Sequence, residues 1–479
     1  MNIRAVGHVL GLLVLCIGLL MAVPALFAWY YGGNDLSAIL ISAGITISAG
    51  AFFALAFRFR GEMMLRDSFA VVTLGWVLAS AFGALPFYLS GEISLYSDAF
   101  FESMSGFTTT GATILVRVED LSHGLLFWRS LTHWIGGMGI IVLSLAILPM
   151  LGVGGMQLYK AEIPGPTPDK ITPRIRQTAM TLWKVYLILS GIEALLLLVG
   201  GLNLHEALCQ TFGTMATGGF STRTASIGGF NSVFIEAVII VFMLIAGTNF
   251  SLHYHALRGK PSTYWKSEEF RFYLGIVAVF GVLLTADNLI TGALSTGHAV
   301  RHSLFQTVSI TTTTGFTTAD FGGWSTSAQL ILLFLMFIGG CAGSTGGSIK
   351  VLRVMILFKQ GLIELKRMLH PRAVMPVRVD DKTVSQGLII NILGFMFLYI
   401  GILLVSTFAM TLMGLDLVSA FASVTASIGN IGPGLGSVGP AENYQHIPLA
   451  GKWLLSFCML AGRLEIYTIL VLFTKDFWR

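Results

Sequence analysis

Residues 97–113 read SDAFFESMSGFTTTGAT, a short helix-compatible run followed by three threonines and a glycine. Three later stretches have the same order of features: HEALCQTFGTMATGGFS at 205–221, RHSLFQTVSITTTTGFT at 301–317 and VSAFASVTASIGNIGPG at 418–434. When the stretches are aligned, their glycines are Gly111, Gly218, Gly315 and Gly432, separated by 107, 97 and 117 residues. Recurrence of one pattern at a nearly regular interval predicts a fourfold internal repeat.

The composition indicates that this repeat lies in a membrane. Hydrophobic residues make up 54% of the 479 residues and charged residues 11%, with a mean hydropathy of +0.79. Soluble proteins carry about a quarter charged residues, so this chain cannot cover a water-facing surface. The composition also excludes a disordered chain, a collagen and a secreted disulfide scaffold. The four cysteines are scattered through apolar stretches without metal-binding spacing, and we expect them to be packing residues.

The segments around the repeated stretches are long enough to cross a bilayer, whose core of about 30 Å needs roughly 20 apolar helical residues. Ten segments qualify: 5–30, 36–57, 68–90, 125–150, 181–202, 232–257, 271–291, 327–358, 386–414 and 448–474. Of the 29 Lys and Arg residues, 23 then lie on the side of the N-terminus, five lie opposite and Arg463 lies within a span. The positive-inside rule therefore predicts cytoplasmic termini. Because the basic residues form short blocks between apolar runs, no nucleic-acid partner is expected.

The four repeated segments are too short to cross the membrane, and they lie between successive spans at 97–114, 204–221, 299–318 and 416–434. We expect each to enter the membrane as a short pore helix and to return as a loop. The sequence thus predicts an all-α integral membrane protein of ten spans, in which four pseudo-repeats of span, pore helix, filter loop and span surround one pore. Two extra N-terminal transmembrane helices occupy residues 1–60, and the pore repeats occupy 61–155, 156–262, 263–380 and 381–479, the third with an intramembrane gate loop.

The glycine in each loop suggests a cation filter built from backbone. Irregular backbone at membrane depth is tolerated only where it is buried in protein or lines a polar path. Glycine readily adopts left-handed conformations that turn neighbouring carbonyls toward one line, and rings of carbonyls replace the water shell of the ion in potassium channels. The expected filter residues are Thr109, Thr110 and Gly111; Ala216, Thr217 and Gly218; Thr313, Thr314 and Gly315; and Asn430, Ile431 and Gly432. The alternative is that glycine and threonine are simply common in membrane helices and loops.

A second glycine-rich stretch interrupts the expected span 327–358. Residues 339–348 read GGCAGSTGGS, and each of the five glycines costs about 1 kcal/mol relative to alanine in a helix. We predict that the helix breaks here across the ion path and forms a gate. The gate residues in this stretch are expected to be Gly339, Gly340, Gly343, Ser344, Thr345, Gly346 and Gly347. The alternative is a hinge or a close-packing site for neighbouring helices.

Arg463 is a second candidate for the gate, because it lies in an apolar span in which Glu465 is the only other charge. An arginine at the centre of a span costs about 3 kcal/mol or more, so it should face a polar path or a partner. Below the filter, its charge would repel cations, and its five donors can bind carbonyls of the 339–348 stretch. The alternative is a structural ion pair with a carboxylate on another helix.

Taken together, these features resemble the TrkH/KtrB branch of the Trk, Ktr and HKT superfamily of K⁺ transporters over nearly the whole chain. The resemblance implies K⁺ uptake across the inner membrane and an obstructing loop at 339–348 that acts with Arg463. It further implies a homodimer with one pore per subunit, and a cytosolic ring of TrkA-type regulatory subunits that carry nucleotide sites. Plant relatives that prefer Na⁺ often carry serine at the first-repeat glycine, so Gly111 favours K⁺. The fourth loop departs most from the family pattern, because Pro433 follows Gly432.

Other classes of function fit the sequence less well. The stretch HEALC at 205–209 is not HExxH, and neither a nucleophile elbow nor a phosphate-binding loop occurs, so an enzyme is not expected. We expect no organic cofactor in this chain, and K⁺ as the transported ion. The closest alternative is a secondary transporter that is coupled to H⁺ or Na⁺ and works by alternating access. Four similar loops favour a fixed pore axis over that alternative.

Overall fold

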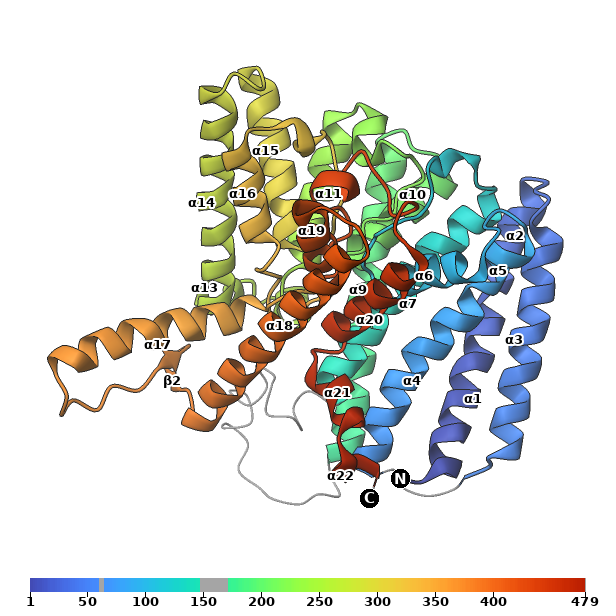
Figure 1. Ribbon diagram of the computed structural model, residues 1–479, viewed down its shortest axis with the longest axis horizontal. Helices are drawn as coiled ribbons and strands as arrows, with labels where there is room; N and C mark the ends of the chain where they lie inside the picture. Colours follow the sequence, from blue (N-terminus) through green and yellow to red (C-terminus); the bar gives the residue numbers. More distant parts are fainter. Residues whose placement is uncertain (60–63, 147–170, 479) are drawn as a thin grey trace.

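The computed structural model describes residues 1–59, 64–146 and 171–478, and these are mainly helical (Figure 1). The α-helices are α1 (Ile3–Leu20), α2 (Ala22–Tyr30), α3 (Leu36–Ala56), α4 (Leu65–Gly83), α5 (Leu85–Leu89), α6 (Tyr96–Phe107), α7 (His123–Ala146), α9 (Ile171–Val199), α10 (Leu204–Met215), α11 (Val233–Ala246), α12 (Phe250–Leu257), α13 (Thr263–Lys266), α14 (Glu268–Ile290), α15 (Thr296–Thr311), α16 (Thr326–Leu335), α17 (Val351–Leu369), α18 (Gln386–Leu412), α19 (Leu417–Ile428), α20 (Leu449–Arg463), α21 (Tyr467–Leu470) and α22 (Lys475–Trp478). A small antiparallel hairpin joins β1 (Arg378–Val379) to β2 (Lys382–Thr383).

Six helical segments among the described residues are continuous, long and apolar enough to cross a membrane. They are Ile3–Tyr30, Leu36–Ala56, Arg66–Leu89, Gln177–Val199, Glu268–Ile290 and Gln386–Leu412. Each coincides with an expected span, and α7 covers the expected span 125–150 as far as residue 146. Both chain termini lie at the same end of the bundle (Figure 1), as termini on one side of a membrane require.

Some sequence-based expectations fall outside the described residues. The expected repeat boundaries after residues 60 and 155 lie there, as do Lys160 and Lys170 of the charge count. The division into four repeat domains and the cytoplasmic side of the termini therefore stay predictions.

The expected span 232–257 is bent rather than straight, which corrects the prediction. Helices α11 and α12 meet there at 104°. The Asn249 side chain caps α12 by accepting a hydrogen bond from the Ser251 N–H at 2.9 Å. The Phe250 N–H donates to the Gly343 carbonyl at 3.1 Å. This turn of the chain therefore contacts the glycine-rich residues 339–348, hereafter the gate stretch, instead of continuing a helix.

The expected span 448–474 is also bent, by 111° between α20 and the segment that begins with α21. Glu465 and Ile466 both have a φ of 57° at the bend, a region that a β-branched residue rarely adopts. The Glu465 carboxylate pairs with Arg353 of α17. The surrounding structure thus holds the chain in a conformation that the local sequence does not favour.

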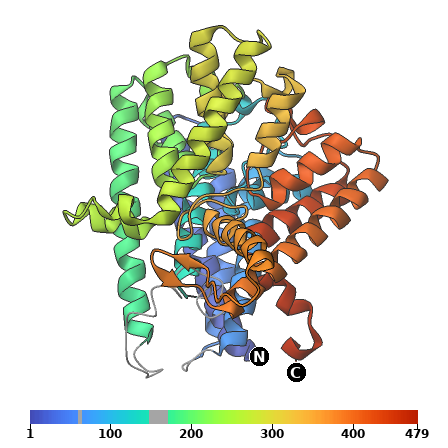
Figure 2. The same cartoon turned by 90° about the vertical axis from the view of Figure 1, so that its left-hand side faces the viewer.

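The helix of the expected span 327–358 is interrupted, as the glycine-rich stretch 339–348 predicts. Helix α16 ends at Leu335 and α17 begins only at Val351. Between them the chain folds back on itself, with a bridge between Ile338 and Ile349. Helix α17 then points away from the bundle, across the direction of α16 (Figures 1 and 2). The glycines account for the break, because they lower the stability of any helix through this stretch.

The four predicted repeats lie around a common centre. Each pore helix packs against the spans of its own repeat and, in three cases, against the second span of the repeat before it. Pore helix α6 packs on α4, α7 and α20; α10 packs on α9, α11 and α7; α15 packs on α14, α16 and α11; α19 packs on α18 and α20. Because α6 of the first repeat meets α20 of the fourth, the arrangement brings all four loops to one centre.

Candidate functional site: four filter loops and an intramembrane gate

The loops that follow the four pore helices share one backbone conformation. Left-handed φ angles of 52° to 59° occur at Thr109, Thr217, Thr313 and Asn430. Left-handed angles of 79° to 99° recur two residues later, at Gly111, Gly219, Gly315 and Gly432. The intervening residue donates its N–H to the carbonyl five residues earlier at 2.8 to 2.9 Å in each loop, as in Thr110 to Ser105. This bond ends the pore helix and starts the loop at the same point in every repeat.

The structure shifts the second filter window by one residue. Gly219, and not Gly218, has the left-handed conformation of Gly111. Gly218 takes the place of Thr110, and Ala216 precedes the left-handed Thr217. The expected window of residues 216–218 is therefore aligned one residue too early, whereas the other three windows align as expected.

The four glycines explain how the loops come close together. A Cβ on Gly111 would collide with the carbonyl oxygen of Gly218, and a Cβ on Gly219 would collide with the carbonyl oxygen of Thr314. A Cβ on Gly315 would collide with the carbonyl oxygen of Ile431. A Cβ on Gly432 would lie 2.8 Å from the carbonyl oxygen of Thr110. Each glycine thus meets the carbonyl that precedes the next glycine, and the fourth loop returns to the first. Any side chain at these positions would push adjoining loops apart.

A cavity of about 90 Å³ touches all four of these glycines. Residues that carry hydroxyl groups line it further, one or more from each repeat, among them Thr113, Ser221, Thr317 and Tyr444. Its charged lining residues are Arg129, Arg223 and Glu442. A polar space of this size holds several waters or a small cation with part of its water shell.

Threonine pairs stabilise two of the loops. In the first loop the hydroxyls of Thr108 and Thr110 are 2.8 Å apart, and in the third loop those of Thr312 and Thr314 are 2.8 Å apart. Both pairs are buried, so each hydrogen bond links the end of the pore helix to the middle of its loop in a place without competing water.

The fourth loop is held differently. The Asn430 side-chain amide donates to the Thr110 hydroxyl at 3.0 Å and to the Met459 carbonyl at 2.9 Å. The Tyr444 hydroxyl donates to the Gly432 carbonyl at 2.7 Å. Asparagine also tolerates the left-handed conformation better than most residues. Asn430 therefore joins the fourth loop to the first loop and to α20.

The stretch between α16 and α17 lies directly against two of the pore helices and their loops. The Gly347 N–H donates to the Thr313 hydroxyl at 2.7 Å. The Thr345 hydroxyl is 3.1 Å from the Met215 carbonyl at the end of α10 and 3.2 Å from the Ala246 carbonyl of α11. This stretch contains all of the expected gate residues other than Arg463: Gly339, Gly340, Gly343, Ser344, Thr345, Gly346 and Gly347.

Two buried charges hold this gate stretch. The Lys350 ammonium donates to the Gly346 carbonyl and lies 3.4 Å from the Ser344 hydroxyl. The Glu269 carboxylate of α14 accepts the Ala342 N–H at 2.6 Å. Hydrogen bonds to charged groups are about twice as strong as neutral ones, so these two side chains stabilise the closed turn.

Arg463 joins the gate stretch to the first repeat. Its side chain is 2% exposed, and its guanidinium donates to the Thr345 carbonyl at 2.7 Å and to the Gly136 carbonyl of α7 at 3.1 Å. Both acceptors are uncharged carbonyls, so these bonds leave the positive charge of Arg463 without compensation. Its role in gating stays a prediction.

Sequence reasoning missed Gly219, Lys350 and Glu269 as parts of this site. Two adjacent glycines at 218 and 219 left the alignment of the second loop open, and counting two residues onward from Thr217 would have resolved it. Lys350 follows the glycine-rich stretch by two residues, and the charge count places it among the 23 basic residues on the side of the N-terminus. No local signal places Glu269 near residue 342.

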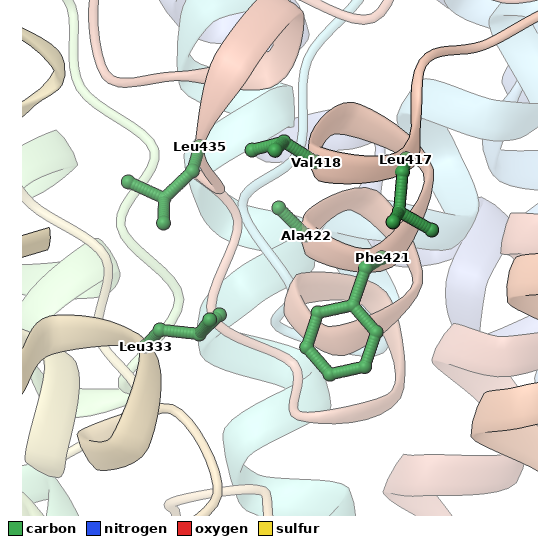
Figure 3. A pocket seen from close by; sticks show the side chains of 6 residues that line it. All are labelled: Leu333, Leu417, Val418, Phe421, Ala422 and Leu435. Atoms are coloured by element: carbon green, nitrogen blue, oxygen red, sulfur yellow. The ribbon is translucent and has the colours of Figure 1, made fainter. Parts of the chain in front are cut away.

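A larger cavity lies apart from the four glycines. It has a volume of about 270 Å³ and lies between α16 and α19 (Figure 3). The residues that line it are Leu333, Leu417, Val418, Phe421, Ala422 and Leu435. A wholly apolar lining offers no ligand to a dehydrated cation, so this cavity does not suit an ion.

Comparisons with known proteins agree with this architecture. The TrkH family, described as a cation transport protein, matches residues 36–478. The chain is 44% identical over 487 residues to the Trk system potassium uptake protein TrkH of Escherichia coli K12, with full coverage of both chains. It is 42% identical over 498 residues to the protein of that name from Vibrio parahaemolyticus, again with full coverage. The crystal structure of the potassium transporter TrkH from Vibrio parahaemolyticus superposes with a TM-score of 0.92 over both full chains, at 39% identity.

Proposed function

The chain belongs to the TrkH family of cation transport proteins, and from this premise we propose that K⁺ crosses the membrane through one pore within the chain. It is a multi-pass membrane protein and a Trk-system potassium uptake transporter, not an enzyme. In the proposed mechanism, main-chain carbonyls of the four loops replace the water shell of the ion. The observation that carries this proposal is the closed ring of four glycines around one polar cavity.

The proposed filter consists of three residues from each loop. They are Thr109, Thr110 and Gly111; Thr217, Gly218 and Gly219; Thr313, Thr314 and Gly315; and Asn430, Ile431 and Gly432. These windows carry no formal charge, so selection rests on carbonyl dipoles and their spacing. The pore helices add to this, because the negative C-terminal end of each lies next to its loop.

Flux measurements on purified protein in liposomes test the filter. K⁺, Rb⁺ and Na⁺ fluxes are compared at a set voltage for the wild type and for Gly111→Ser, which places a side chain against the second loop. We expect the preference for K⁺ over Na⁺ to fall. Gly292→Ser is the matched control, since Gly292 is also left-handed but has open space around it. An unchanged preference in Gly111→Ser would remove this loop from the filter.

The proposed gate is the stretch between α16 and α17 together with Arg463. It lies against the inner ends of the second and third pore helices, where Thr345 contacts Met215. In the closed state the backbone of residues 339–347 obstructs the path, and the Arg463 charge repels cations that enter it. Opening requires the stretch to leave its contacts with Thr313, Met215 and Arg463.

An ion-coupled secondary transporter is the alternative mechanism. Two bent helix pairs, with angles of 104° and 111°, favour it to some extent, because broken helices are common in such transporters. Alternating access gives slow, saturable flux that depends on an H⁺ or Na⁺ gradient. A pore gives K⁺ current without either gradient, and the liposome assay distinguishes the two.

We propose the remaining features from the family resemblance. The protein acts as a homodimer in the bacterial inner membrane with both termini in the cytoplasm. Its cytosolic side binds a ring of TrkA-type subunits, which supply the nucleotide sites that this chain is not expected to have. Co-purification of a soluble nucleotide-binding protein with the full chain, and its loss at high salt, tests this partner.

A further inference from the structure

Phe220, the residue after the second filter glycine, is held between two side chains of α7. The Arg129 guanidinium lies over one face of the ring, 3.4 Å from its centroid. The His133 ring stacks on Phe220 at 4.0 Å between centroids, with 15° between the planes. Arg129 and His133 are four residues apart and so project from one side of the helix. All three side chains are buried.

Glu102 of α6 connects this arrangement to the first filter loop. Its carboxylate accepts the Arg129 Nε–H at 2.7 Å, the Thr113 hydroxyl at 2.9 Å and the Ile114 N–H at 3.0 Å. On the other side, Arg129 Nη1 donates to the Ser221 carbonyl at 3.1 Å. The pair therefore links the backbone just after Gly111 to the backbone just after Gly219.

The fourth repeat shows that this packing position does not require charge. Gly136 of α7 and Gly462 of α20 are equivalent, because a Cβ on either would collide with the last carbonyl of its own pore helix, from Phe107 and Ile428. Arg129 and His133 lie seven and three residues before Gly136. The positions seven and three before Gly462 hold Leu455 and Met459, both buried.

A buried ion pair contributes little net stability compared with well-packed apolar residues. The apolar pair on α20 shows that the equivalent positions of the fourth repeat hold such residues. The charges on α6 and α7 thus need an explanation other than packing. Their contacts converge on the segments that follow two filter glycines, and Arg129 also lines the cavity that those glycines share.

We propose that Glu102, Arg129 and Phe220 are positioning residues that set the separation of the first and second filter loops and thereby the ion preference. This inference rests on the proposed carbonyl filter. The contact of the Arg129 guanidinium with the Phe220 ring holds the second loop in place relative to α7. Glu102 holds the first loop in place relative to the same arginine. Glu102 also compensates the Arg129 charge, which would otherwise repel cations from the cavity.

Arg129→Lys is the first test variant, since lysine keeps the charge but loses the planar fork and the stacking face. Phe220→Leu is the second, since it keeps an apolar side chain without a ring. K⁺ and Na⁺ fluxes in liposomes give the preference ratio for each. We expect each variant to lower this ratio by up to about thirtyfold, the size of one desolvated cation–π contact. The double variant should lower it no further, because the two residues act through one contact.

Arg301→Lys is the matched control. Arg301 of α15 pairs with Glu236 of α11 at 2.5 Å and also joins two repeats, but the pair contacts no filter window. We expect its preference ratio to equal that of the wild type. Equal losses of K⁺ and Na⁺ flux in Arg129→Lys and Phe220→Leu, with the ratio unchanged, would refute a positioning role and leave a purely structural one.

Gly111→Ser in the same assay separates this inference from the filter itself. If Gly111→Ser changes the ratio and neither positioning variant does, only the positioning role is wrong. If Gly111→Ser leaves the ratio unchanged as well, the carbonyl filter fails and the inference fails with it. The amount of each variant in the membrane is measured first, and Phe220→Leu provides the answer if Arg129→Lys does not accumulate.

Discussion

Replacing Arg463 with alanine should increase K⁺ flux, and the structure provides the size of the effect. The guanidinium donates to Thr345 of the gate stretch and to Gly136 of α7. Hydrogen bonds from a charged group contribute about 1.5–3 kcal/mol each, and one of these two bonds is made to the gate stretch, so the variant loses about 1.5–3 kcal/mol that holds this stretch in place. Part of this is recovered by water, but the closed state becomes less stable than in the wild type.

The charge of Arg463 adds a second term. A K⁺ ion about 4 Å from the guanidinium is repelled by about 4 kcal/mol at an effective dielectric constant of 20. Since about 1.36 kcal/mol changes a rate tenfold, removal of this repulsion can raise flux by up to about 10³. Because the gate stretch stays partly in the path, we expect a rise of at least about tenfold.

The assay is K⁺-driven Rb⁺ uptake into liposomes that contain equal amounts of each purified variant. Arg463→Lys keeps a positive charge but loses the planar guanidinium that donates to two carbonyls. Its flux should therefore lie between those of the wild type and Arg463→Ala. Arg258→Ala is the control, because Arg258 is exposed and does not contact the gate stretch. Wild-type flux in Arg463→Ala, with normal reconstitution, would show that Arg463 is not part of the gate.

Four further variants test other parts of the site. Gly219→Ala should abolish K⁺ preference, because its Cβ would meet the Thr314 carbonyl oxygen. Gly218→Ala should retain part of this preference, because the nearest atoms to its Cβ belong to the His133 side chain and not to backbone. A greater loss of preference in Gly218→Ala than in Gly219→Ala, measured by liposome flux, would favour the window 216–218. Asn430→Ala should lower the midpoint temperature of unfolding of the purified protein, because alanine costs about 1–2 kcal/mol in the left-handed conformation and two hydrogen bonds are lost. An unchanged midpoint would argue that Asn430 does not stabilise the fourth loop. Lys350→Met should raise K⁺ flux less than Arg463→Ala does, since it removes only contacts with Ser344 and Gly346 inside the gate stretch. A reduced flux would contradict this.

The positions of the pore helices could be read from the sequence with small errors. The expected segments 204–221 and 416–434 contain α10 (204–215) and α19 (417–428), each followed by its loop. This success has a physical cause, because short helix-compatible runs between long apolar spans leave few other ways to satisfy backbone groups in a membrane. The single-residue error at Gly218 arose where two adjacent glycines made local composition ambiguous.

The bends could not be read from the sequence. Residues 464–466 read LEI, which contains no proline or glycine, yet Glu465 and Ile466 adopt left-handed φ angles. The bend depends on distant partners, since Glu465 pairs with Arg353 of α17 and Ile466 is fully buried. The hydropathy of a sequence shows how long its apolar segments are. It cannot show contacts between residues more than 100 positions apart, such as the one that holds this bend.

The four loops combine a symmetric backbone with asymmetric support. In the proposed filter the backbone repeats closely because carbonyl spacing would determine which ion fits, and every loop would contribute to that spacing. The supporting side chains are free to differ as long as the spacing is kept. Thus threonine pairs hold loops one and three, α7 side chains hold loop two, and Asn430 holds loop four. It follows that substitutions in the support should affect ion preference unequally among repeats, whereas substitutions of Gly111, Gly219 and Gly315, each of whose Cβ atoms would collide with a carbonyl oxygen, should affect it alike.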